Sequence, residues 1–178
     1  EVTINSCNLC APLGAALAFK GVQKCMLLLH GSQGCATYIR RYRIAHFREP
    51  VDIASSSFSE DAAVFGGGEN LKKALDNIIS EYEPAIIAVA TTCLSETIGD
   101  NVAMFIKEYY RQHESRDIPL IIEVSTPSYS GNHSVGFFKA QKALVSTFVP
   151  EGVKRERINV FINMFSPGEI RHLKRILN

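Results

Sequence analysis

Three of the five cysteines stand where a helix is expected to begin. Cys35 follows a glycine-containing loop after the apolar run 25–29, and Cys93 follows a second apolar run, 85–90. Cys10 precedes Ala-Pro, and proline is favoured in the first turn of a helix. Because a helix amino terminus stabilises a thiolate, we expect a lowered pKa at Cys35. Three such cysteines can converge on one iron–sulfur cluster.

The same cysteines also have a plainer interpretation. An isolated cysteine is most often a small buried apolar residue, and dispersed cysteines are a weak metal signal. Cys7 and Cys10 form one Cys-x-x-Cys pair, and Cys25 lies inside an apolar run, where a core residue is expected. An odd number of cysteines without a signal-peptide pattern argues against a disulfide framework. The residue types alone leave metal binding and packing both open.

Other side chains with chemical potential form no recognised motif. The five histidines lack metal-ligand spacing, and each is expected to be a surface or structural residue. Gly66–Gly68 lacks the lysine of a phosphate-binding loop, and no Gly-x-Ser-x-Gly sequence occurs. The basic run Arg40–Arg43 is typical of a solvated helix face or of a surface that pairs with carboxylates across an interface.

Strand, loop and helix alternate along most of the chain. Runs that are apolar throughout predict strands buried on both faces, at 25–29, 51–54, 85–90, 120–124 and 158–162. Helices are expected over 36–47, 70–82 and 100–113, and a capping box from Ser166 to Glu169 opens a last one. The order predicts an α/β fold, a doubly wound, mostly parallel sheet with helices on both faces. Ligands of such sheets bind at the carboxyl ends of the strands, where Cys35, Cys93 and the hydroxyl-rich loop 125–131 fall.

The composition is that of an ordinary globular domain. The chain has 178 residues, of which 46% are hydrophobic and 21% charged, and its formal net charge is +1. No apolar run is long enough to cross a bilayer. We expect a cytoplasmic protein that binds neither nucleic acid nor membrane. Residues 1–178 are expected to form a single domain of a longer chain, since the sequence does not begin with Met, and the family resemblance given below implies that this is the N-terminal domain.

Six separated motifs resemble the β-type subunit of the nitrogenase component 1 family, in that family's order. The intervals of 25, 58 and 35 residues between Cys10, Cys35, Cys93 and Ser128 match the family pattern without a gap. The motifs are Cys10–Ala15, His30–Tyr38, His46–Pro50, Glu60–Gly67, Thr91–Cys93 and Thr126–Ser128.

The resemblance implies a cofactor and partners. In β-type subunits of the molybdenum-iron protein, the cysteines matching Cys10, Cys35 and Cys93 ligate the P-cluster, an 8Fe-7S electron relay shared with the α-type subunit of a heterotetramer. The serine matching Ser128 adds a redox-dependent ligand. The phenylalanine matching Phe65 lies where the ATP-driven iron protein docks, although without the resemblance Phe65 could equally be a core residue of a short helix.

The implied function is that of an oxidoreductase subunit within a complex. A domain of this kind passes electrons from the iron protein towards a cofactor held by the α-type partner, and the isolated domain is expected to be inactive. The family also contains scaffold subunits for assembly of the iron-molybdenum cofactor, which carry a 4Fe-4S cluster. Segments 15–19 and 148–151 resemble those scaffolds, but many second-type scaffold subunits lack the cysteines matching Cys10 and Cys93. A third possibility, a dinucleotide-binding domain, lacks the Gly-x-Gly-x-x-Gly sequence after the first expected strand.

Overall fold

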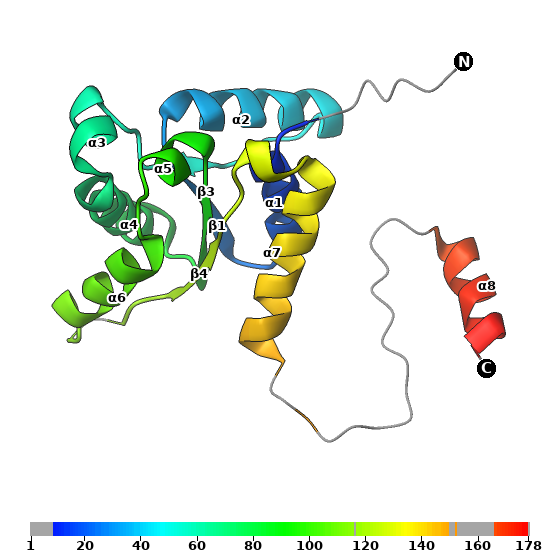
Figure 1. Ribbon diagram of the computed structural model, residues 1–178. Coiled ribbons are helices and arrows are strands. Elements are labelled where there is room, and N and C mark those ends of the chain that lie inside the picture. Colours follow the sequence, from blue (N-terminus) through cyan, green and yellow to red (C-terminus); the bar gives the residue numbers. More distant parts are fainter. Residues whose placement is uncertain (1–8, 116, 150–151, 153–165, 178) are drawn as a thin grey trace, which may run out of the picture.

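Four parallel strands form the central sheet (Figure 1). The computed structural model describes residues 9–115, 117–149, 152 and 166–177. The strand order is β2-β1-β3-β4, with the bounds β1 (Cys25–His30), β2 (Ala54–Ser55), β3 (Ile86–Thr91) and β4 (Leu120–Val124). In register, Leu28 of β1 pairs with Ala54 on one side and Val89 on the other. Parallel neighbours require crossover connections, and helices supply them.

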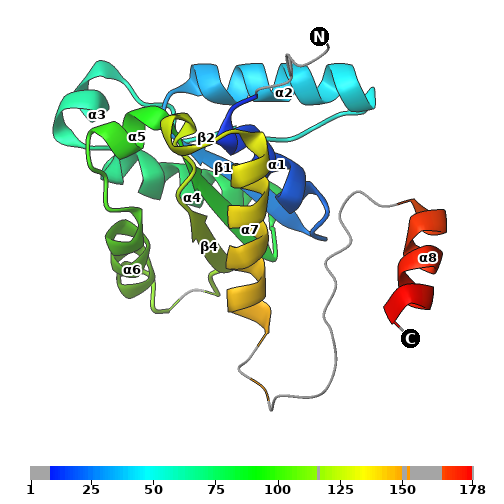
Figure 2. The same cartoon turned by 45° about the vertical axis from the view of Figure 1, so that its right-hand side comes forward.

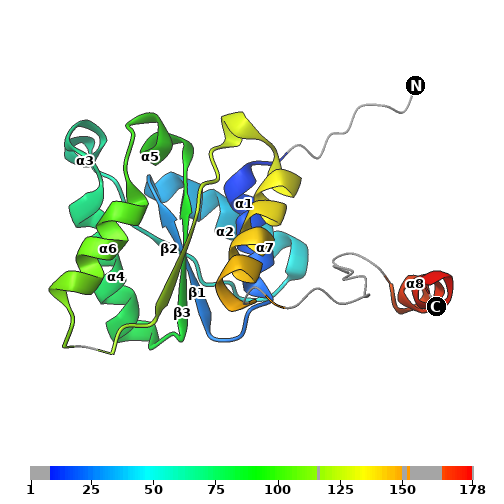
Figure 3. The same cartoon turned by 60° about the horizontal axis from the view of Figure 1, so that its bottom comes forward.

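Helices cover both faces of the sheet, so the strands form the middle layer (Figure 3). One face packs against α1 (Ala11–Lys20), α2 (Gln33–Phe47) and α7 (His133–Phe148). The other face packs against α4 (Gly68–Tyr82) and α6 (Val102–Gln112). Two short helices, α3 (Glu60–Phe65) and α5 (Cys93–Thr97), and the 3₁₀ turn η1 (Ser128–Ser130) follow strand ends. α8 spans Pro167–Leu177.

Each strand contributes to both cores, because successive side chains point to opposite faces. In β1, Leu27 and Leu29 pack towards α1, whereas Met26 and Leu28 pack towards α4. Burial on both faces explains why these strands are apolar throughout, and it confirms the predicted doubly wound fold. No helix in the described part of the chain is long and apolar enough to cross a membrane.

The predicted elements agree with the structure in most places. β4 has the predicted bounds, β1 ends one residue later than predicted, and β3 is shifted by one residue at both ends. The strand expected at 51–54 is wrong in position, since only Ala54–Ser55 pairs with β1. The run 158–162 lies outside the described residues. The capping box is confirmed: Glu169 N donates to Ser166 Oγ, and Ser166 N donates to Glu169 Oε2.

Candidate metal centre

Cys10, Cys35 and Cys93 line one cavity of about 520 Å³, and Ser128 lines it with them. The cavity lies at the carboxyl edge of the sheet, because Cys35 follows β1 and Cys93 follows β3. The prediction that these cysteine loops gather at one edge is confirmed. Cys25 stands at the opposite end of β1, half-buried, and burial raises the pKa of its thiol to about 11.

Cys10 is held by two helices. It is the N-cap residue of α1, and its carbonyl accepts a hydrogen bond from Leu13 N at 3.2 Å. It also forms an antiparallel bridge with Asn132, the N-cap of α7, and His133 N donates to Leu9 O at 2.8 Å. The position of Cys10 therefore depends on how α1 and α7 pack.

α1 and α7 lie side by side, and glycine at two positions permits their close approach (Figure 2). A Cβ atom at Gly14 of α1 would stand 1.7 Å from the backbone oxygen of His133. A Cβ atom at Gly136 of α7 would stand 1.9 Å from the backbone oxygen of Ala11. Neither backbone can yield by that much without the helices separating, so the two glycines set the distance between the helices.

The other two cysteines begin helices. Cys93 is the first residue of α5, after the N-cap Thr92, and its Sγ accepts a hydrogen bond from Ser128 N at 3.2 Å. Cys35 lies in the first turn of α2, where the N-cap Ser32 Oγ accepts from Gly34 N at 3.3 Å. The hydrogen bond from Ser128 brings η1 against Cys93, although 35 positions separate the two residues in sequence.

The predicted lowering of the Cys35 pKa is wrong. The side chain keeps exposed surface, yet the protein around it removes enough hydration to raise the pKa of its thiol. Coulombic repulsion from the neighbouring Cys10 and Cys93 side chains raises the Cys35 pKa further. A helix dipole contributes only about 0.3–1 kcal/mol at such a site, and desolvation and like charge outweigh it. A bound metal cation reverses this balance and deprotonates a coordinating thiol.

The donor set suits several metal ions better than one. Among the described residues, no three His, Cys, Asp or Glu side chains lie close enough to hold a single ion. The three thiols surround a cavity of about 520 Å³ instead, far larger than the ~30 Å³ that one water occupies. Cysteine thiolates are the usual ligands of iron–sulfur clusters. The residues present therefore fit a polynuclear cluster.

A buried histidine supports the loops around the cavity. His30, the last residue of β1, is fully buried and edge-on to the Phe58 ring. Its Nε2 lies 3.0 Å from Asp100 Oδ2, and its Nδ1 lies 3.1 Å from Ser56 Oγ. The sequence indicated only that His30 ends a strand; its partners come from distant loops and carry no sequence motif.

Phe65 is an exposed residue at the end of α3. Its exposed fraction is 87%, and that of the adjacent Val64 is 75%. Phe65 is therefore not a core residue of a short helix, which was the alternative interpretation. Two neighbouring apolar side chains in solvent form a small exposed apolar surface.

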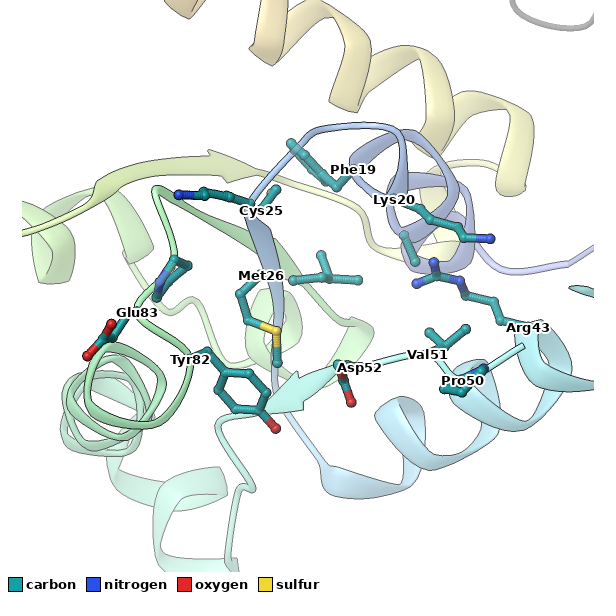
Figure 4. Close-up of a pocket in the computed structure, with 14 residues that line it drawn as sticks. Phe19, Lys20, Cys25, Met26, Arg43, Pro50, Val51, Asp52, Tyr82 and Glu83 are labelled. Carbon is teal, nitrogen blue, oxygen red and sulfur yellow. The ribbon is translucent and has the colours of Figure 1, made fainter. Parts of the chain in front are cut away.

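A second cavity, of about 390 Å³, lies beside the amino end of β1 (Figure 4). Arg43 lines it together with Lys24 and Asp52. Arg43 is only 5% exposed, burial lowers its pKa, and its Nε has no hydrogen-bond partner among the described residues. The expectation that the whole run Arg40–Arg43 is a solvated helix face is thus wrong for Arg43, although Arg40 and Arg41 are exposed.

The fold and the cavity define a doubly wound α/β domain that gathers three thiols at the carboxyl edge of its sheet. Residues 10–178 match the family model described as nitrogenase component 1 type oxidoreductase. The nitrogenase molybdenum-iron protein beta chain of Clostridium pasteurianum is 42% identical over 174 residues, which cover 97% of this chain and 38% of that one. The chain of the same name from Azotobacter vinelandii is 38% identical over 184 residues, which cover 99% of this chain and 35% of that one.

A solved structure agrees with the sequence relatives. The structure described as nitrogenase Cp1 at pH 6.5 has a TM-score of 0.83 and 41% identity, and the match covers 98% of this chain and 38% of that one. The chain belongs to the nitrogenase component 1 family, on its β-type branch. It spans about two fifths of the length of the curated relatives named above.

Proposed function

We propose that this domain is the P-cluster-binding, electron-relay part of a β-type component 1 subunit, in which Cys10, Cys35 and Cys93 ligate an iron–sulfur cluster. The observation that carries the proposal is that these three cysteines and Ser128 line one cavity. An iron–sulfur cluster bound there supplies reversible electron transfer. In such a complex the domain passes electrons on and does not itself reduce substrate.

The chain's own residues support such a cluster in two ways. Three thiols, each at the start of a helix, provide ligands from three separate loops. The hydrogen bond from Ser128 N to Cys93 Sγ adds a donor to a ligand sulfur, and such bonds tune cluster potential. Ser128 lines the same cavity, and we propose its hydroxyl as the additional oxygen ligand.

Partner chains complete the site in this proposal. Three cysteines leave an eight-iron cluster short of ligands, and Cys35 keeps exposed surface. We infer that an α-type subunit covers the cavity and supplies the missing ligands, within a heterotetramer. The exposed Phe65 and Val64 offer an apolar anchor for the iron protein, since aromatic side chains dominate many protein interfaces.

The test is metal analysis of the full-length subunit purified with its α-type partner in the absence of oxygen. A relay predicts about eight irons at the shared site, whereas an assembly scaffold predicts about four. The isolated domain, purified in air, should contain almost no iron, because an exposed cluster is oxidised and lost. A heteromer with no iron beyond background would contradict both forms of the proposal.

A further inference from the structure

His30 and Asp100 form a buried pair to which the proposed function assigns no role. His30 is 0% exposed, and the Asp100 side chain is 4% exposed. Burial lowers the pKa of His30 by more than the neighbouring Asp100 raises it, which favours the neutral form of the ring. With its proton on Nε2, His30 donates to Asp100 Oδ2, and Nδ1 accepts from the Ser56 hydroxyl. One assignment of protons thus satisfies both contacts.

Asp100 connects this pair to α3. Both oxygens of its carboxylate lie within hydrogen-bond distance of Gly67 N, at 3.1 and 3.0 Å. Gly67 comes two residues after Phe65, just beyond the carboxyl end of α3. The carboxylate therefore fixes the backbone at the point where the chain leaves the exposed helix.

His30 connects the pair to the loop that carries Cys93. Its backbone oxygen accepts from Thr92 N at 3.1 Å, from Thr92 Oγ1 at 3.0 Å and from Ser95 Oγ at 2.9 Å. Thr92 and Ser95 form the capping box that starts α5 at Cys93. Three hydrogen bonds to one oxygen hold the start of that helix against the end of β1.

Ser56 connects the pair to the loop that carries Cys35. Its Oγ accepts from Gly31 N at 2.9 Å while it lies 3.1 Å from His30 Nδ1. Gly31 begins the segment that leads through Ser32 into α2 and Cys35. The exit of α3 and both cysteine loops are thereby joined to one buried histidine.

We propose that the His30–Asp100 pair is a positioning device that transmits a displacement of α3, made when a partner docks at Phe65, to the loops carrying Cys35 and Cys93. The inference rests on the proposed function, because it takes α3 as the docking surface. The links run through buried groups, and a buried hydrogen bond cannot be exchanged for water without cost. Movement of Gly67 must therefore move Asp100 and His30 or break their bonds.

Hydrogen–deuterium exchange of the full-length heteromer, with and without the iron protein, tests this coupling. In the wild type, docking should slow exchange in residues 60–67 and also in 31–35 and 92–97. In Asp100→Ala, docking should still slow exchange in 60–67, but the slowing in the other two segments, about tenfold in the wild type, should disappear. Tyr109→Phe is the control, since it removes the bond from the last turn of α6 to Asp76 of α4, which involves neither His30 nor Asp100, and leaves the pair intact.

Two further variants keep the test decisive if Asp100→Ala folds poorly. Ser56→Ala removes the bonds of Ser56 Oγ to Gly31 N and to His30 Nδ1, and it leaves the bonds of His30 to Asp100 and to the start of α5. It should therefore lose the transmitted protection in 31–35 and keep it in 92–97. Asp100→Asn should retain both, since its amide can accept from Gly67 N and donate to a His30 ring protonated on Nδ1. Wild-type protection in Asp100→Ala, or equal protection of both segments in Ser56→Ala, would overturn the coupling.

The coupling and the proposed cluster can fail separately. Iron measured on the same wild-type samples tests the cluster, and an iron-free heteromer would contradict the proposed function while the exchange pattern still decides the coupling. Absence of protection at 60–67 in the wild type would contradict docking at α3 and overturn the coupling with it.

Discussion

The crossing of α1 and α7 predicts a large effect for Gly14→Ala. The added Cβ would stand 1.7 Å from His133 O, whereas an ordinary Cβ contact is 3.4–4 Å. The obstacle is backbone, so the helices must separate by on the order of 2 Å, and this clash costs about 3 kcal/mol, the upper end of the usual range for overpacking. The better helix propensity of alanine offsets about 1 kcal/mol of this cost. We expect a net loss of about 2 kcal/mol.

Thermal unfolding followed by circular dichroism measures this loss. For a chain of this size about 2 kcal/mol corresponds to a fall in Tm of roughly 4–8 °C. Gly21→Ala is the matched control at the C-cap of α1, since its nearest non-neighbouring atom is 3.5 Å away and its φ is −74°. That variant should keep the wild-type Tm within about 2 °C. A Gly14→Ala protein as stable as Gly21→Ala would refute the view that the crossing sets the position of Cys10.

Three other outcomes follow from the fold and the site. The metal-free chain should unfold cooperatively, because two buried cores stabilise it without a cluster, and an uncooperative apo-protein would contradict this. Cys25, with a pKa of about 11, should react with iodoacetamide at pH 9 more slowly than free cysteine, and an equal rate would refute its burial. Arg43→Met should leave the free energy of unfolding unchanged or raise it by about 1 kcal/mol, because it removes a buried guanidinium whose Nε has no hydrogen-bond partner in the described part of the chain. A loss of more than about 1 kcal/mol there would show that Arg43 has a partner.

Strong apolar periodicity made most of the fold predictable. β1, β3 and β4 are buried on both faces, so their sequences are apolar throughout, and α4 and α6 carry clear apolar stripes. α7 was not predicted because it meets α1 through small residues, Gly136 and Ala140, and shows no large apolar stripe. The helix expected after Cys93 was placed at 100–113, and α5 was not predicted as a separate element because five residues are too few to establish a helical period.

The site was predictable in position and not in its electrostatics. Parallel strands end at one edge, so the cysteines that follow β1 and β3 had to lie near one another. The pKa of Cys35 is raised first by burial and then by the proximity of Cys10 and Cys93, and spacing in the sequence gives neither. The His30–Asp100 contact spans 70 positions and depends on the tertiary fold alone.

The central claim is that Cys35 is a cluster ligand and Cys25 is not. The most direct measurement is the iron content of the full-length heteromer, purified without oxygen, for Cys35→Ala beside the control Cys25→Ala. The account predicts that Cys35→Ala lowers iron content and slows electron delivery from the iron protein, with the circular dichroism spectrum unchanged, while Cys25→Ala keeps wild-type iron. Wild-type iron and electron delivery in Cys35→Ala would contradict the account and leave only a likeness of fold.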